Sequence, residues 1–131
     1  MISQEAQNVM AVMATMKAPN IRELPIELLR KGMEGMMSFA LPPVGCMIEN
    51  VNAGGPEALW VKMFNQNEND KATILYLHGG AYSMCSPQTH IGITGLLSDL
   101  SQIRVLSVDY RLAPENPYPA AIEDAVKAYR W

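Results

Sequence analysis

The middle of the chain alternates between short apolar runs and polar or glycine-rich breaks, which is the pattern of a β-sheet. Apolar runs over residues 47–51 and 58–64 are separated by Asn52-Ala53-Gly54-Gly55-Pro56, a strong turn signal, and predict an antiparallel hairpin. Runs over 72–77 and 104–108 predict two more strands, and the first of these is apolar enough to be buried on both faces. A helical connection between these two strands predicts that they lie parallel.

Helical spacing marks the remaining segments. A helix is expected over residues 3–17, and a second one begins near Pro25 and carries a stripe rich in methionine. The simpler interpretation of that stripe is packing against a core, since flexible thioethers fill irregular gaps. The alternative is a mobile apolar cover over a binding site.

Two further helices are expected in the second half of the chain. One begins at Ser86-Pro87, and the other begins at about Pro119. The first has four apolar residues at helical spacing: Ile93, Leu96, Leu97 and Leu100. Residues 109–119 hold three prolines in a short span and predict a rigid loop. The whole order is two helices, a hairpin and then β-α-β-α, which indicates an α/β sheet with a helical N-terminal appendage.

Composition narrows the class of protein. The chain has 131 residues, of which 49% are hydrophobic and 18% charged, as expected for one modest globular domain. A net charge of −3 argues against a nucleic-acid partner, and no stretch approaches the roughly 20 apolar residues of a membrane span. Cys46 and Cys85 have neither metal-site spacing nor a disulfide framework, so a reduced, cytoplasmic protein without a metal site is expected.

Two motifs, each after a predicted strand, carry the chemistry. The first is His78-Gly79-Gly80-Ala81-Tyr82, where a strand meets a glycine turn ahead of a helix. Such a turn presents free backbone N–H groups to an anionic oxygen. The second motif is Asp-Tyr-Arg-Leu-Ala-Pro-Glu at 109–115, followed by Pro-Tyr-Pro-Ala-Ala-Ile-Glu-Asp-Ala at 117–125.

Together these motifs resemble the hormone-sensitive-lipase-like family of α/β-hydrolase carboxylesterases, most clearly over residues 72–131. The resemblance implies an α/β-hydrolase fold truncated after its first parallel strands. It also implies a helical cap over residues 1–43 and the N-terminal part of a catalytic domain over 44–131. The implied activity is hydrolysis of short-chain carboxylic esters through a serine acyl-enzyme, with a small-molecule ester as substrate and no cofactor.

The resemblance also implies roles for single residues. The N–H groups of Gly80 and Ala81 correspond to oxyanion-hole donors, with alanine where the family most often has a third glycine. His78 and Gly79 complete the loop motif, and Tyr82 either lines the substrate pocket or packs. The residues that open the second motif, Asp109, Tyr110 and Arg111, correspond to a structural motif.

Each of these residues also has a simpler interpretation. His78 precedes the expected nucleophile, so positioning the loop is favoured over general-base catalysis. Asp109 and Arg111 are interpreted as an ion-paired anchor of the loop rather than as catalytic groups, and Gly79 as a requirement of the turn. Cys85 lacks an evident paired base and is interpreted as a buried thiol.

A nucleophile is missing from the sequence. None of the serines lies in a Gly-x-Ser-x-Gly context, and the family order places serine, acid and histidine after Trp131. The chain alone is therefore expected to be inactive. Two alternatives stay open: a non-catalytic homologue that binds a small molecule, or a fragment active only beside a second polypeptide. That second polypeptide is either the missing C-terminal half or a homodimer partner.

Overall fold

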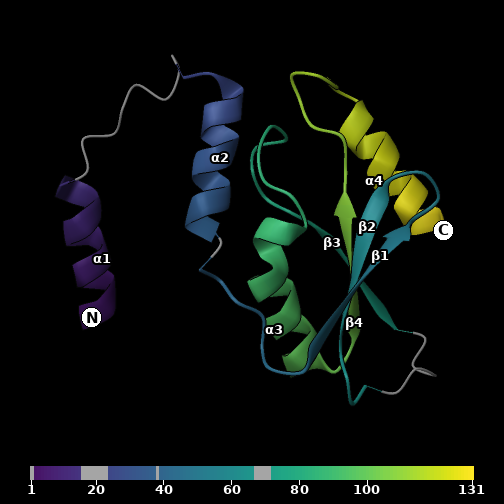
Figure 1. Ribbon diagram of the computed structural model, residues 1–131, viewed down its shortest axis with the longest axis horizontal. Coiled ribbons are helices and arrows are strands. Elements are labelled where there is room, and N and C mark those ends of the chain that lie inside the picture. The colour runs from purple at the N-terminus through teal and green to yellow at the C-terminus, as the bar shows by residue number, and fades with distance from the viewer. Residues whose placement is uncertain (1, 16–23, 38, 67–71) are drawn as a thin grey trace.

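The computed structural model describes residues 2–15, 24–37, 39–66 and 72–131, and its centre is a four-stranded sheet with helices on both faces (Figure 1). The elements in chain order are α1 Gln4–Thr15, α2 Ile26–Met37, β1 Cys46–Asn52, β2 Glu57–Met63, β3 Thr73–Leu77, a 3-10 turn Gln88–His90, α3 Ile91–Ser101, β4 Arg104–Asp109 and α4 Ala120–Arg130. The predicted elements are therefore confirmed within a few residues at each end. Residues 16 and 17, predicted as the end of the first helix, lie outside the described residues.

The sheet is mixed, with the strand order β1-β2-β4-β3. β1 and β2 form the predicted antiparallel hairpin, and its turn is held by the Asn52 side chain, which accepts from Gly55 N (2.9 Å) and donates to Gly55 O (3.1 Å). β3 and β4 are parallel, as the crossover rule predicts. β3 is therefore an edge strand of the sheet.

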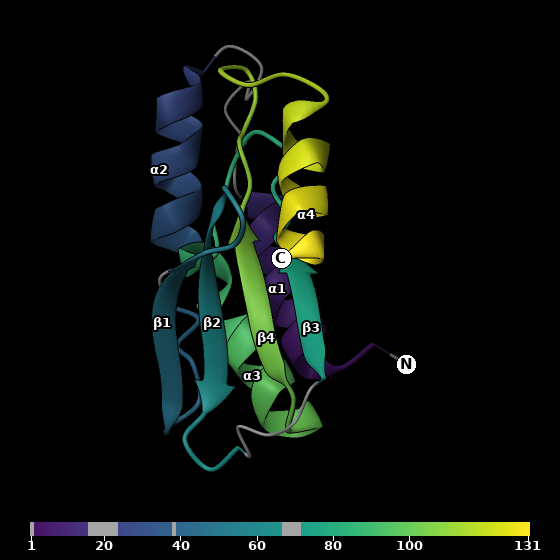
Figure 2. The same ribbon diagram turned by 90° about the vertical axis from the view of Figure 1, so that its right-hand side faces the viewer.

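The core lies on both faces of the sheet because β4 alternates between them. Val105 packs on one face with Leu59 and Val61 and the start of α3, whereas Leu106 and Val108 pack on the other face with residues of α4 such as Ala128. Figure 2 shows α4 in front of the strands and α3 behind them. Because β4 is buried on both faces, its sequence is a nearly continuous apolar run.

Helix α3 buries the face opposite to its apolar stripe. Ile93, Leu96, Leu97 and Leu100 are 37% to 82% exposed, whereas the small residues Gly92, Thr94, Gly95 and Ser98 are buried. A Cβ on Gly92 would lie 2.6 Å from Ala40 O, and a Cβ on Gly95 would lie 2.8 Å from Pro43 Cδ. Segment 40–43 therefore needs the two glycines in order to pass close to the helix.

The N-terminal helices α1 and α2 lie on the same side of the sheet as α3, with α1 outermost (Figure 1). No residue of α2 is buried. No helix among the described residues has the length and apolar character needed to cross a membrane. The division of the chain at residue 43 stays a prediction.

Candidate functional site

The loop that follows β3 has an unusual run of left-handed backbone. Gly80 has φ 123°, Ala81 54°, Tyr82 59° and Cys85 68°. Ser83 N and Met84 N donate to Gly80 O at 3.1 and 2.9 Å and close the loop. Three non-glycine residues in this region are costly, and such strain persists only where the surroundings determine it.

Only one glycine of the loop motif is required by its geometry. A Cβ on Gly80 would lie 2.1 Å from Met84 O, whereas the φ of Ala81 is in the small region that L-residues tolerate. Gly79 has no left-handed φ, and a Cβ there would meet His90 Nε2 at an ordinary 3.6 Å. The interpretation of Gly79 as a requirement of the turn is therefore wrong, and Gly80 has that role.

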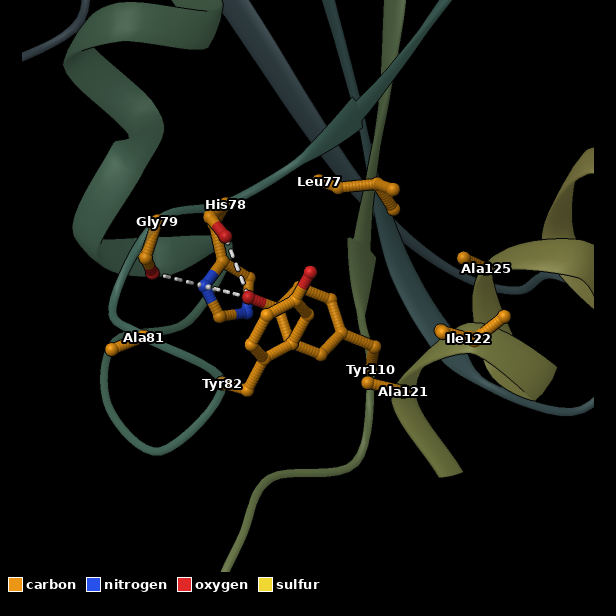
Figure 3. Close-up of a pocket in the computed structure, with 9 residues that line it drawn as sticks. All are labelled: Leu77, His78, Gly79, Ala81, Tyr82, Tyr110, Ala121, Ile122 and Ala125. Atoms are coloured by element: carbon orange, nitrogen blue, oxygen red, sulfur yellow. Dashed lines mark hydrogen bonds between the residues drawn. The ribbon is translucent and has the colours of Figure 1, made fainter. Parts of the chain in front are cut away.

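The amides at the start of this turn are available as donors. Among the described residues, the N–H groups of Gly80 and Ala81 have no hydrogen-bond acceptor. Ala81 lines a mostly apolar cavity of about 320 Å³ between the loop and α4 (Figure 3). The other residues that line it are Leu77, His78, Gly79, Tyr82, Tyr110, Ala121, Ile122 and Ala125. An anionic oxygen at this edge of the cavity could accept hydrogen bonds from these amides.

His78 is buried and holds the loop to the end of β4. Its ring stacks on Tyr110, with centroids 4.2 Å apart, and its Nδ1 lies 2.8 Å from Gly79 O, so Nδ1 carries the proton (Figure 3). The hydroxyl of Tyr110 donates to His78 O at 2.6 Å. Burial lowers the pKa of His78, and the same cause raises the pKa of Tyr110 to about 12. Both side chains are therefore neutral at pH 7. Their contacts are consistent with the predicted role of His78 in positioning the loop.

His90 extends this buried cluster, which the sequence did not indicate. Its ring centroid lies 5.7 Å from that of His78, and the residue is only 7% exposed. The Thr89 hydroxyl donates to Ser86 O at 2.7 Å, so it accepts from His90 Nδ1 at 2.9 Å. His90 therefore joins the start of α3 to the back of the loop.

The loop that follows β4 is anchored by Arg111, as predicted. Its Nε donates to Asp124 Oδ2 at 2.7 Å, its Nη2 to Oδ1 at 2.9 Å, and its backbone N to Oδ2 at 3.1 Å. Burial pushes the pKa of Asp124 upward, but the hydrogen bonds and charge of Arg111 outweigh it and hold the pKa below its ordinary value. A second contact runs from Arg111 to Glu123 at 3.1 Å.

Asp109 does not share in this anchor. Within the described residues its carboxylate makes no hydrogen bond or ion pair, so the interpretation of Asp109 as an ion-paired group is wrong there. It lies opposite Glu57 in the β2–β4 register. The residue is exposed as a whole, yet burial of its carboxyl by surrounding protein raises its pKa, with a further rise from Glu57 and an opposing effect of His78.

Tyr82 stands between two cavities. The residue is 64% exposed and lines both the 320 Å³ cavity and a second one of about 430 Å³ beside the proline-rich loop. Both cavities also share Ala121 and Ile122. Tyr82 therefore borders open space, as expected of a pocket residue, while its ring also contacts Tyr110 at a centroid distance of 6.2 Å.

Arg30 is a second residue that the sequence did not indicate. It projects from α2, and its guanidinium reaches Ser83 O at 2.9 Å, Ala113 O at 3.0 Å and both oxygens of Glu115 at 2.8 Å. These partners lie 53 to 85 residues away in the chain. No local signal could have paired them.

The described part of the chain holds neither a metal cluster nor an activated nucleophile. No group of three or more His, Cys, Asp or Glu side chains there could hold a metal ion. No described serine hydroxyl is hydrogen-bonded to a histidine ring; Ser98 and Ser107, for example, are fully buried in α3 and β4. Cys85 is a buried free thiol, as predicted.

Known proteins are similar to this chain in sequence and in structure. A family model described as the alpha/beta hydrolase fold matches residues 74–131. An acetyl-hydrolase of Streptomyces hygroscopicus is 41% identical over 100 residues, which are 76% of this chain and 31% of that protein. The carboxylesterase/phospholipase LipF of Mycobacterium tuberculosis is 36% identical over 103 residues, 74% of this chain and 28% of the relative. A crystal structure of a hormone-sensitive lipase from a metagenome library superimposes with a TM-score of 0.85 at 35% identity, covering 99% of this chain and 42% of that one.

By its fold, the chain is the first part of an α/β hydrolase. Within that class it is similar to the N-terminal portion of the hormone-sensitive-lipase-like carboxylesterases, and these findings support the predicted family and fold class. It spans about a third of the length of the curated relatives and less than half of the solved structure.

Proposed function

We propose that this chain supplies the oxyanion-hole loop of a serine carboxylesterase that acts on short-chain carboxylic esters. The N–H groups of Gly80 and Ala81 would bind the carbonyl oxygen as it becomes an oxyanion. A serine outside the described residues would attack the carbonyl carbon, and the alcohol would leave when the tetrahedral intermediate collapses. His78 and Tyr110 hold the loop and take no proton from the nucleophile.

The observation that carries this proposal is a pair of successive amides, those of Gly80 and Ala81, which have no acceptor among the described residues. Ala81 lines an apolar cavity and is exposed, and Gly80 is partly buried, so both amides are open to a ligand. Two in succession, held in a strained turn by a buried histidine, are suited to stabilise charge that develops during a reaction. The carboxylesterase relatives support the choice of ester over other acyl substrates.

We further propose that additional polypeptide pairs with β3. No described strand pairs with the outer edge of β3, and Leu77 at its end is 48% exposed. Edge strands of this kind attract another strand. The missing C-terminal half is the favoured partner because relatives are more than twice as long as this chain, and a second copy is the alternative. A cytoplasmic location also stays a prediction, supported by two free cysteines.

The test compares two polypeptides: the 131-residue chain, and a longer one that continues beyond Trp131. Both are assayed against p-nitrophenyl acetate, butyrate and longer esters, and both are treated with a fluorophosphonate followed by peptide mass mapping. The longer polypeptide is expected to hydrolyse the short esters with saturation kinetics and to be labelled on one serine after Trp131. The chain alone is expected to stay at the background rate and to remain unlabelled.

Two results would contradict the proposal. Saturable turnover by the 131-residue chain, abolished by changing one of its own side chains, would place the nucleophile within it. A longer polypeptide that binds short esters or acids but neither turns over nor reacts with the fluorophosphonate would instead be the non-catalytic binding homologue.

A further inference from the structure

We propose that Arg30 is a positioning residue for the oxyanion loop, because its guanidinium fixes the turn that presents the Gly80 and Ala81 amides and ties that turn to α2. This inference rests on the proposed function of the loop. It adds a residue from the N-terminal helices to a site whose motifs all lie after residue 77.

The contacts of Arg30 join three segments at one point. Its Nη1 and Nη2 each bond one oxygen of Glu115 at 2.8 Å, its Nη2 also donates to Ala113 O, and its Nε donates to Ser83 O. The Arg30 side chain is 24% exposed; its bonds to the two carbonyls are partly buried, whereas its pair with Glu115, which is 50% exposed, faces solvent. A planar fork with fixed donors can reach three separate acceptors in this way, whereas the single ammonium of lysine cannot match it.

The carbonyl that Arg30 binds belongs to the turn that shapes the donor site. Ser83 and Met84 donate their N–H groups to Gly80 O, so the peptide between them lies directly against Gly80. The preceding carbonyl, Tyr82 O, accepts from Ala113 N at 2.8 Å. Two consecutive carbonyls of the loop therefore accept hydrogen bonds from other segments. Tyr82 O accepts from the loop that follows β4, and Ser83 O accepts from α2.

The strained backbone of the loop requires hydrogen bonds of this kind from neighbouring segments. Four left-handed residues between Gly80 and Cys85 favour relaxation to another conformation unless neighbouring groups determine their angles. Helix α2 has no buried residue, so ordinary core packing does not fix its place. The four hydrogen bonds of Arg30 therefore set the position of the helix and of the loop together.

The first test uses NMR on the isotope-labelled polypeptide with Arg30→Ala, Arg30→Lys and the control Lys31→Ala. Lys31 is the next residue on α2, is exposed and makes no hydrogen bond or ion pair with a described residue of either loop. Both Arg30 variants are expected to shift the amide signals of Gly80 and Ala81 and to speed exchange at Ser83 and Met84 by about tenfold or more. Signals of the β1–β2 hairpin should not change, and in Arg30→Ala the pKa of the Glu115 carboxyl, which Arg30 is the main cause of lowering to about 2, should rise.

Chemical rescue separates positioning from general stability. Free guanidinium at low millimolar concentration should return the Gly80 and Ala81 signals of Arg30→Ala toward those of the unsubstituted protein, and lysine at this position should not. If Arg30→Ala loses the hairpin signals as well, Glu115→Gln is the variant to use, since it removes the charge pair and leaves the other acceptors. Unchanged loop signals in whichever variant stays folded would overturn the proposal.

An activity measurement keeps this inference distinct from the proposed function. In a polypeptide that hydrolyses esters, Arg30→Ala is expected to lower kcat by about tenfold or more with little change in KM, since misplaced donors affect the transition state most. Absence of hydrolysis by the unsubstituted polypeptide would refute the proposed function and leave the amide test valid. Full activity of Arg30→Ala with unmoved amides would refute this inference alone.

Discussion

Gly80 and Ala81 are neighbours with opposite tolerance to a side chain. A Cβ at Gly80 would collide with the Met84 carbonyl, and its φ of 123° is outside the regions open to L-residues. Ala81, at φ 54°, already accepts a Cβ at the cost of the left-handed conformation. The difference between the two positions is therefore a backbone property that can be tested by exchanging the two residue types.

Gly80→Ala is predicted to destabilise the protein by about 2 kcal/mol or more and to disrupt the loop. Ala81→Gly is predicted to keep the fold and to change the free energy of unfolding by less than about 1 kcal/mol, because relief of strain offsets the added freedom of the unfolded chain. Urea unfolding of both variants gives the comparison. Equal effects of the two substitutions would show that the left-handed turn does not form.

The hydroxyl of Tyr110 serves a buried carbonyl, so its loss is predicted to be costly. Tyr110→Phe keeps the stacking on His78 but leaves His78 O without its 2.6 Å donor, and a loss of about 1 to 3 kcal/mol in unfolding free energy is expected. Tyr129→Phe is the matched control, since that ring is 79% exposed. A loss no larger than in the control would mean that the carbonyl finds another donor.

Burial of His78 predicts a pH dependence of stability. Its pKa is lowered in the folded state, chiefly by burial, so the unfolded chain binds the proton more readily. Stability from this group is then fully present above the ordinary pKa of 6.5 and is lost as the pH falls below that value. His78→Phe, which preserves a ring, should flatten the unfolding free energy between about pH 5 and pH 7 relative to the unsubstituted protein. An unchanged pH profile would show that the dependence does not arise from His78.

At the scale of elements, α4 is joined to the second loop by a charged pair whose acid is buried. Asp124 is 3% exposed, and its oxygens accept three hydrogen bonds from Arg111. Asp124→Asn is predicted to destabilise by about 2 to 3 kcal/mol, less than a fully buried pair because Arg111 is partly exposed. Glu123→Gln, which alters the exposed partner of the same arginine, should cost under about 1 kcal/mol. Thermal or urea unfolding of the two variants ranks them, and a reversed order would contradict the assigned anchor.

Local signals are what made most elements predictable. The hairpin followed from Asn52 to Pro56 between apolar runs, and the parallel pair followed from the connecting helix, because both rules act over short stretches of chain. The burial of α3 did not follow. Its leucine stripe faces out because segment 40–43, distant in sequence, occupies the side with the two glycines.

The site was predictable to the same extent. The motifs located Gly80, Ala81, His78 and Tyr110 because these residues follow strands whose ends meet at one edge of the sheet (Figure 2). Three features were not predictable because they depend on contacts between residues that the local pattern does not pair. They are the requirement for glycine at position 80, the position of His90 and the hydrogen bonds of Arg30. Asp109 was misread because sequence adjacency to Arg111 suggested a pair that the loop geometry does not form.

On the scale of the molecule, the described residues correspond to less than half of a solved relative. One edge of the sheet is open, and the exposed apolar side chains of α3 lie to one side of it. The chain matches 42% of a solved hormone-sensitive lipase at a TM-score of 0.85, so its geometry is similar to that part of the lipase. Under the proposed function, the oxyanion loop belongs to this chain and the reacting serine lies outside the described residues.

The central claim is that the Gly80 and Ala81 amides bind the oxyanion, and NMR of a covalent adduct tests it most directly. A polypeptide containing this chain and a reactive serine is treated with a p-nitrophenyl alkylphosphonate, which forms a tetrahedral adduct bearing an anionic oxygen. The account predicts downfield shifts of the Gly80 and Ala81 amide protons and slowed exchange at both. Adduct formation with these two signals unmoved, while other amides shift, would contradict it.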